Sequence, residues 1–143
     1  MPESTIPTFT KLTPNLLVSN VERSLAFYVD ELGFAQGMTV PDASPFVFAQ
    51  VTNGAVEIFF NDAKGAVEEY PSLGGRPLGL TGTIFIEVQN IHALHDRLKD
   101  RVTIVMPFVT QWYGMMEFAI ADPDGYIITF AERVAAGTQA STD

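Results

Sequence analysis

The same short pattern occurs twice in this chain, and the repeat constrains the fold more than any other feature of the sequence. Residues 18–21 read Val-Ser-Asn-Val, and residues 88–91, 70 positions further on, read Val-Gln-Asn-Ile. A strand-like run precedes each copy, and a helical spacing of apolar residues follows it. Two copies of one supersecondary unit indicate a pseudo-two-fold domain. We expect its ligand cleft to lie between or inside the two copies.

The first copy is predicted to fold as a strand, a helix and three further strands. Residues 12–18 are strand-like, and Ser19 or Asn20 is placed to cap the helix that follows, with Ser19 and Glu22 at the spacing of a capping box. Gly33 stands where a glycine commonly ends a helix. The three further runs, rich in β-branched and aromatic residues, are 34–40, 46–51 and 55–60.

Turn and linker residues separate these elements. Asn53-Gly54, between the last two strands of the first copy, favours a type I′ hairpin turn. Residues 62–80 show no periodicity, so we expect a connector without regular structure, of the kind that often serves as a lid or a linker. Residues 122–125 read Asp-Pro-Asp-Gly, which is typical of a turn.

The second copy repeats the order of the first. We expect a strand at 81–88, a helix with apolar positions 91, 94, 98 and 102, and strands at 103–106, 116–121 and 126–131. The result is an α+β chain of two tandem βαβββ modules. With 143 residues it is one domain, since domains usually have roughly 100–200 residues. The predicted domain covers residues 12–132 and consists of a first module at 12–61, a linker at 62–80 and a second module at 81–132. Residues 1–11 and 133–143 are predicted to be loose ends.

The charge balance limits the partners. Lys and Arg number 8 against 17 Asp and Glu, and the net charge of −9 disfavours nucleic acid and anionic membranes. It favours a cationic ligand or a metal, although acidity also serves solubility alone. The chain has no cysteine, which excludes disulfides, zinc–thiolate sites and thiol nucleophiles. No signal peptide is evident and no apolar run approaches the roughly 20 residues that span a bilayer, so we expect a cytoplasmic protein.

Several segments resemble one known superfamily. Residues 18–28 read Val-Ser-Asn-Val-Glu-Arg-Ser-Leu-Ala-Phe-Tyr and 31–34 read Glu-Leu-Gly-Phe; 112–118 read Trp-Tyr-Gly-Met-Met-Glu-Phe and 122–126 read Asp-Pro-Asp-Gly-Tyr. Their order and spacing resemble the vicinal oxygen chelate superfamily, the glyoxalase, bleomycin resistance and dioxygenase group. The stretch 111–122 is more similar to the bleomycin-resistance branch than to the glyoxalase I branch. The resemblance implies strands curved into a partly closed barrel or cup, helices outside it, and dimers with crevices between the subunits.

The resemblance also implies where a metal would be bound. Metal-dependent members take one ligand from the first and one from the last strand of each module. The corresponding positions here are Thr13, Glu57, Thr83 and Thr129. Glu57 alone keeps a ligand type that Zn, Ni or Fe sites use, because a threonine hydroxyl is a poor ligand for such metals. We therefore expect no tightly bound catalytic metal and no cofactor.

Glu57 and a set of aromatic side chains are the candidate ligand contacts. Strand alternation puts Glu57 and Phe59 on the same face, and the opposite, more apolar face with Ile58 and Phe60 is expected against the helices. Glu57 either faces the cup, as a partner for a cation or as a base with a raised pKa, or faces solvent. Phe46 and Phe48 are expected to share one strand face. The full candidate set is Phe46, Phe48, Glu57, Phe59, Phe108, Trp112, Tyr113 and Met115, whose aromatic and Met members either wall a ligand site or belong to the core.

Two other groups are interpreted as structural. His92 and His95 are three apart on the predicted helix and would suggest a metal pair, but helices lie outside the barrel in the fold that the resemblance implies. Asp122 and Asp124 lack the spaced oxygen ligands of a calcium loop, so we interpret them as turn residues.

Three functions are consistent with the sequence. The first is a metal-free, homodimeric protein that binds a small cationic or aromatic molecule such as an antibiotic. The second is a lyase, isomerase or dioxygenase of the same superfamily, with a displaced metal site or with Glu57 as base. The third is a module that binds a partner protein and whose cup has lost its function.

Overall fold

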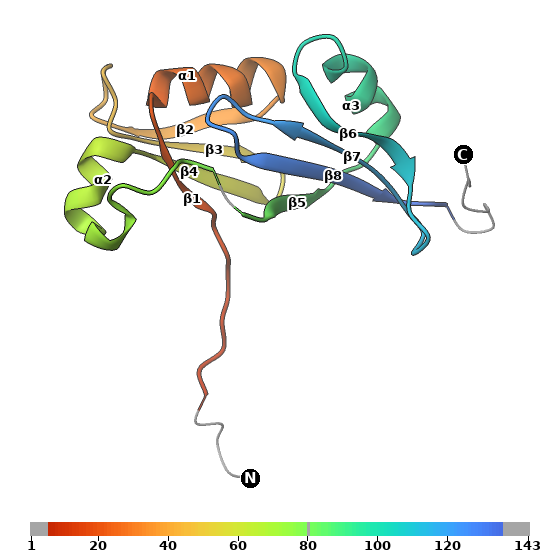
Figure 1. Cartoon of the computed structure of the whole chain (residues 1–143), viewed down its shortest axis with the longest axis horizontal. Helices are drawn as coiled ribbons and strands as arrows, with labels where there is room; N and C mark the ends of the chain where they lie inside the picture. The colour runs from red at the N-terminus through yellow and green to blue at the C-terminus, as the bar shows by residue number, and fades with distance from the viewer. Residues whose placement is uncertain (1–5, 80, 136–143) are drawn as a thin grey trace.

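Two four-stranded sheets, one from each half of the chain, make up the protein (Figure 1). The structure is a computed structural model that describes residues 6–79 and 81–135. The first half contains β1 (Asn15–Val18), α1 (Val21–Ala26) with a π-helical turn (Phe27–Glu31), β2 (Ala35–Val40), β3 (Phe48–Asn53) and β4 (Val56–Asp62). The second half contains β5 (Thr83–Glu87), α3 (Ile91–Leu98), β6 (Thr103–Thr110), β7 (Met115–Ala121) and β8 (Ile127–Arg133).

The two sheets have the same topology. The first has the order β1-β4-β3-β2 and the second β5-β8-β7-β6. In each, the first strand of the module runs parallel to the last, and the other neighbours are antiparallel. The α+β class and the two βαβββ modules that the repeat predicts are thus confirmed.

The first helix begins at Asn20, one of the two caps expected. Its side-chain oxygen accepts a hydrogen bond from the backbone N–H of Arg23 at 2.8 Å. The capping box between Ser19 and Glu22 does not form, because the Glu22 carboxylate instead accepts hydrogen bonds from Ser44 and from the backbone N–H of Phe46. The segment 41–46, which precedes β3, is thereby held against the start of the helix.

The hairpin between β3 and β4 forms as expected, but with a different turn. Asn53 pairs with Val56, so Gly54 and Ala55 make the two-residue loop. Gly54 has a φ of +57° and Ala55 has a negative φ. A type I′ turn needs positive φ at both central residues, so that expectation is wrong.

The connector 62–80 contains regular structure, against the expectation. A helix, α2 (Ala63–Glu69), is followed by a 3₁₀ turn (Pro71–Leu73). Ala63, Ala66, Val67 and Tyr70 have the spacing of one helix face, and Ala66 is buried. The helical signal was therefore present, in a segment whose several glycines suggested a loop.

Both modules contribute to one hydrophobic core. Figure 1 shows α1 and α3 on the same side of the sheets, and the buried residues beneath them form a single cluster that includes Phe60 of β4 and Phe118 of β7. Arg97 of α3 donates hydrogen bonds to the carbonyls of Asp30 and Glu31 at the end of the first helical segment. The modules therefore contact each other through side chains and helix ends, while no strand of one sheet pairs with a strand of the other in the described residues.

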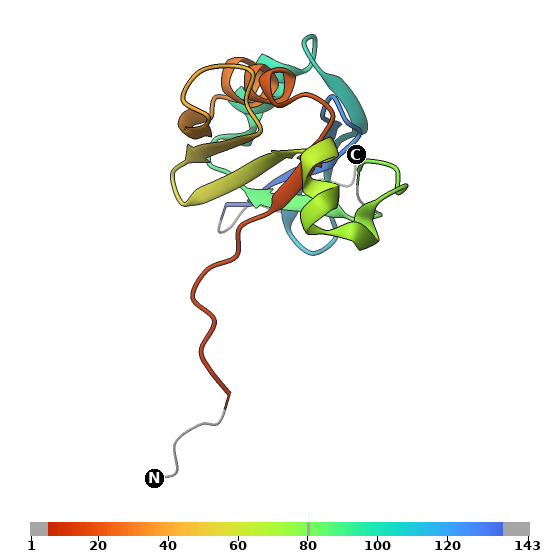
Figure 2. The ribbon, with the colours of Figure 1, turned by 90° about the vertical axis from the view of Figure 1, so that its left-hand side faces the viewer.

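The ends of the chain differ from the expected loose ends in part. Residues 6–14 have no regular structure and lead away from the body of the protein (Figure 2). β8 continues to Arg133, one residue into the expected C-terminal loose end, and residues 1–5 and 136–143 lie outside the described residues. Across 6–79 and 81–135, no helix has the length and apolar character needed to cross a membrane.

Candidate functional site

Glu57 and Phe59 lie together on the face of the first sheet that points away from the helices. Ile58 and Phe60 are fully buried on the opposite face, as the alternation along β4 predicts. Phe48 of β3 packs edge-to-face against Phe59, with 5.1 Å between the ring centroids. We call Phe48, Gln50, Glu57 and Phe59 the first-sheet face.

The Glu57 carboxylate is held by three polar side chains. Thr13 donates from its hydroxyl at 2.9 Å, Gln50 from its amide at 2.5 Å, and the Lys11 ammonium lies 2.7 Å away. The Glu57 side chain is 12% exposed, whereas Lys11 is 60% exposed.

These contacts decide the protonation state of Glu57. The hydrogen bond from Lys11, followed by those from Gln50 and Thr13, lowers the pKa of the Glu57 carboxyl below its ordinary value. The carboxylate is therefore charged at neutral pH. Of the alternatives for Glu57, this direction fits a partner for a cation and not a base with a raised pKa, because the partners stabilise the charged form.

A second carboxylate lies on the corresponding face of the second sheet. Glu117 of β7 is 3% exposed and accepts hydrogen bonds from the Tyr113 hydroxyl at 2.6 Å and from the Gln111 amide at 3.3 Å. The bond to Glu117 raises the pKa of the Tyr113 phenol. Trp112 packs edge-to-face on Tyr113 at 5.3 Å and is 90% exposed. Two of the aromatic candidates, Trp112 and Tyr113, thus lie together beside the Glu117 carboxylate.

The four positions that correspond to metal ligands are paired within each module. Thr13 bonds to Glu57, and the Thr129 hydroxyl donates to that of Thr83 at 3.2 Å. Only one of the four is a carboxylate, and an ammonium already lies against it. This set does not match the imidazole and carboxylate donors of Zn, Ni or Fe sites. Elsewhere in the described part of the chain, no three His, Cys, Asp or Glu side chains come together.

Two candidates lie apart from these faces. Phe46 does not share a face with Phe48, because β3 begins at Phe48 and Phe46 lies beside Glu22 of α1. Phe108 of β6 stacks on the ring of His92 at 4.9 Å, under α3. Met115 is buried.

The residues interpreted as structural have structural contacts. His95 packs edge-to-face on Phe108 and Phe118, between α3 and the second sheet. Asp122 accepts hydrogen bonds from the backbone N–H groups of Asp124 and Tyr126, both at 2.9 Å, which is how an Asp stabilises a turn.

Two of the residues that contact Glu57, Gln50 and Lys11, are not in the candidate set predicted from the sequence. Gln50 alternates with Phe48 on β3, so the reasoning applied to β4 would have found it. Lys11 lies in an irregular segment far from Glu57 along the chain, and no local pattern indicates their contact.

The chain is similar to known proteins over most of its length. A sequence model of the Glyoxalase/Bleomycin resistance protein/Dioxygenase superfamily matches residues 8–130. Bleomycin resistance proteins of Geobacillus stearothermophilus and Staphylococcus aureus are 26% identical over 129 residues, which is 85% of this chain and 95% of theirs.

Solved structures share the fold. A glyoxalase/bleomycin resistance protein/dioxygenase from Nocardioides superposes with a TM-score of 0.75 at 20% identity, over 97% of this chain and 93% of its own. The bleomycin-binding protein of Streptomyces verticillus, solved with copper(II)-bleomycin, superposes with a TM-score of 0.60 at 23% identity, over 91% of this chain and 99% of its own. With the paired βαβββ modules and the extent of the sequence match, the chain belongs to the Glyoxalase/Bleomycin resistance protein/Dioxygenase superfamily.

Proposed function

We propose that this protein binds, on the first-sheet face, a small molecule that carries both a cationic group and an aromatic ring. We also propose that no metal is bound by Thr13, Glu57, Thr83 and Thr129, the positions that correspond to the metal ligands of the superfamily. One observation carries the proposal. The Lys11 ammonium already lies 2.7 Å from Glu57 on the same face as the Phe48–Phe59 ring pair. A ligand ammonium would take the place of Lys11, which is largely exposed and belongs to an irregular segment.

The chemistry of this face suits such a ligand. A carboxylate with a lowered pKa supplies a permanent negative charge at neutral pH. Aromatic ring faces attract cations and give large apolar contact area. The net charge of −9 adds a long-range attraction for cations. The bleomycin resistance relatives and the bleomycin-binding protein support a ligand of the antibiotic type.

A homodimer is part of this proposal. Several large apolar side chains are left exposed, among them Phe9 and Leu12 in the irregular segment before β1, Phe85 on β5, and Trp112 and Tyr113 before β7. Exposed apolar side chains that gather into one patch are typical of surfaces that another chain covers, and we propose that these residues do so in a dimer. A second copy seated on these residues would convert the open faces into crevices. Sedimentation velocity would show a dimer, and a monomer at all concentrations would contradict this part.

The binding proposal is tested with bleomycin and a panel of basic aromatic compounds. We expect saturating ligand to raise the melting temperature, because it binds only the folded state. Glu57→Gln should weaken binding by about tenfold or more, the effect of losing a charge-assisted hydrogen bond. Glu68→Gln, on the exposed side of α2, is the matched control and should bind as the wild type does. No thermal shift with any compound, or equal effects of the two variants, would overturn the proposal.

The absence of a metal is tested separately. Mass-spectrometric metal analysis of untagged protein, purified without chelator and then incubated with Ni, Zn, Mn or Fe(II), should find far less than one metal per chain. One metal ion per chain would contradict the proposal that the protein binds its ligand without a metal. Lyase, isomerase and dioxygenase activities would then be assayed. An enzyme with Glu57 as base is not favoured, because a carboxylate with a lowered pKa is a weak base. We further propose that the unit 12–132 acts as a single binding domain in the cytoplasm.

A further inference from the structure

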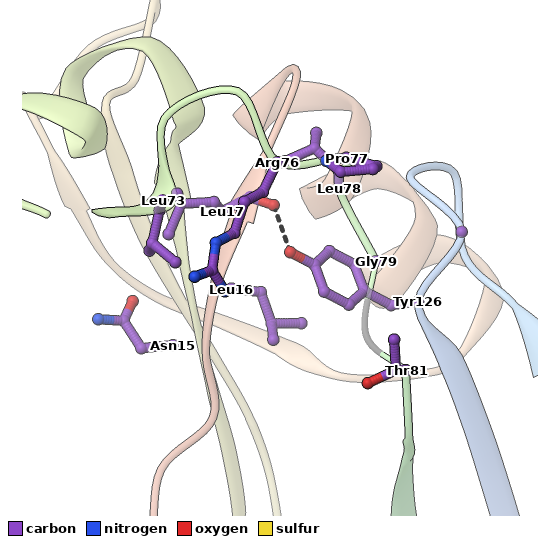
Figure 3. Close-up of a pocket in the computed structure, with 11 residues that line it drawn as sticks. Asn15, Leu16, Leu17, Leu73, Arg76, Pro77, Leu78, Gly79, Thr81 and Tyr126 are labelled. Carbon is purple, nitrogen blue, oxygen red and sulfur yellow. Dashed lines mark hydrogen bonds between the residues drawn. The ribbon is translucent and has the colours of Figure 1, made fainter. Parts of the chain in front are cut away.

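A cavity of about 530 Å³ lies between the two modules and shares no lining residue with the first-sheet face (Figure 3). It is formed by β1, by the connector after the 3₁₀ turn, and by the turn before β8. Its volume falls within the range of roughly 300–1,000 Å³ that small-molecule sites have. The side chains and backbone that line it belong to Asn15, Leu16, Leu17, Leu73, Arg76, Pro77, Leu78, Gly79, Thr81, Gly125 and Tyr126.

The wall of this cavity is largely apolar and is held in place by defined contacts. The Tyr126 hydroxyl donates to the carbonyl of Leu17 at 2.7 Å, shown dashed in Figure 3. Gly79 has a φ of +95°, and a Cβ there would lie 3.3 Å from the carbonyl oxygen of Gly125. Only a glycine lets the connector approach the turn this closely. These two contacts fix Tyr126 and the connector in position at one edge of the cavity.

One end of the cavity is cationic. Arg76 lines it, and within the described residues its guanidinium has neither an ion pair nor a hydrogen bond. Figure 3 shows the Arg76 side chain reaching between Leu73 and Leu16, toward the side of the cavity where Asn15 lies. Asn15 accepts a hydrogen bond from Asn61 through its side-chain oxygen, which leaves its amide nitrogen as a further donor.

We propose that this cavity binds an amphipathic carboxylate, a small acid with an apolar chain or ring. The carboxylate would pair with the Arg76 guanidinium, whose planar fork matches its geometry, and would accept from the Asn15 amide. The apolar part would lie against Leu17, Leu78 and Tyr126. Asn15 pairs with Phe59 between β1 and β4, so the cavity adjoins the first-sheet face. The two sites differ in chemistry, because the cavity prefers a ligand whose charge is opposite to that of the first-sheet ligand.

Decanoate is a suitable probe, with decan-1-ol and decylammonium as controls that share its chain. We expect decanoate to bind in calorimetry and to shift the amide resonances of Gly79 and Gly125, and the alcohol and the amine to bind more weakly. Arg76→Gln should weaken decanoate binding by about tenfold or more, and Arg76→Lys should weaken it less. Lys64→Gln on α2 removes the same charge outside the cavity and should leave the affinity unchanged.

Three results would overturn the proposal: no binding at about 1 mM decanoate, equal losses in Arg76→Gln and Lys64→Gln, or shifts at Glu57 and Phe59 in place of those at the cavity. Arg76→Gln should leave the binding of bleomycin or a basic aromatic compound unchanged. The outcome for this cavity is thus independent of the outcome for the first-sheet face.

Discussion

The hydroxyl of Tyr28 donates a hydrogen bond of 2.8 Å to Asp122, joining the first helical segment to the turn between β7 and β8. Both residues are buried, at 0% and 5% exposure. Burial raises the pKa of both groups, and the hydrogen bond from Tyr28 opposes part of that rise at Asp122. A polar contact deep between the modules thus depends on one hydroxyl.

Tyr28→Phe should lower the free energy of unfolding by about 1–3 kcal/mol, because the buried carboxylate loses a partner. Urea unfolding measures this, with Tyr70→Phe at an exposed position as the control. The pKa of Asp122 should rise further in the variant. A group whose folded pKa is raised contributes less stability as the pH increases through that pKa, so the loss should grow from acid toward neutral pH. Equal stabilities of the two variants would contradict the assignment.

Lys11→Gln should raise the pKa of Glu57 toward its ordinary value, because the ammonium is the main cause of its lowering. Since the folded pKa of Glu57 is below the unfolded one, its contribution to stability is present above the unfolded pKa and is lost as the pH falls through the folded pKa. The variant should lose less stability in acid than the wild type does. Carboxyl carbon shifts followed by NMR report the pKa directly, and Lys64→Gln should leave it unchanged.

Glu132→Ala should destabilise the protein by about 1 kcal/mol, the usual effect of losing a helix cap. The Glu132 carboxylate accepts the backbone N–H groups of Asn90 and Ile91 at 2.9 and 3.0 Å, and these bonds lower its pKa. Asn90 itself makes no side-chain cap at the start of α3. Thermal unfolding compared with Glu68→Ala provides the check, and Glu132→Gln should recover part of the loss.

Two glycine substitutions should have effects of opposite sign. Gly33 has a φ of +87° and open space around a built Cβ, so Gly33→Ala should cost about 1–2 kcal/mol through the backbone alone. Gly65 lies inside α2, also with open space, and Gly65→Ala should stabilise by about 0.5–1 kcal/mol. The denaturant midpoints of the two variants, compared with that of the wild type, measure these changes in stability. Changes of the same sign would show that the backbone conformation of one of the two glycines is misassigned.

The sequence was most informative where one local rule acts repeatedly. The repeat at 18–21 and 88–91 predicts both modules because each copy marks the same strand-to-helix junction. Period-two alternation along β4 places Glu57 and Phe59 correctly, since a strand has only two faces. The prediction that Phe46 shares a face with Phe48 is wrong, because β3 begins at Phe48 and strand alternation does not apply before it. The position of Phe46 is set by the hydrogen bond from its backbone N–H to Glu22.

The properties of the site depended on contacts that the sequence does not encode locally. Whether Glu57 is a base or a fixed anion is decided by Lys11, which reaches it from the irregular segment before β1. The Arg76 cavity needs three segments from both modules, and its walls have no common motif. Such long-range pairs have no periodic signal, because they depend on how the strands and the connector are arranged in the folded chain.

The single cluster of buried residues beneath α1 and α3 affects how the protein unfolds on heating and what one module would lose if it were expressed alone. Because the sheets share no strand pairing in the described residues, cohesion between the halves comes from side-chain packing, and both should unfold in one calorimetric transition. A half-length chain expressed alone would keep the packing of Tyr28 on Phe60, but the buried Tyr28 hydroxyl would lose its Asp122 partner. It would also lose the hydrogen bonds from Arg97 to Asp30 and Glu31, so each module is completed by polar contacts that the other one supplies.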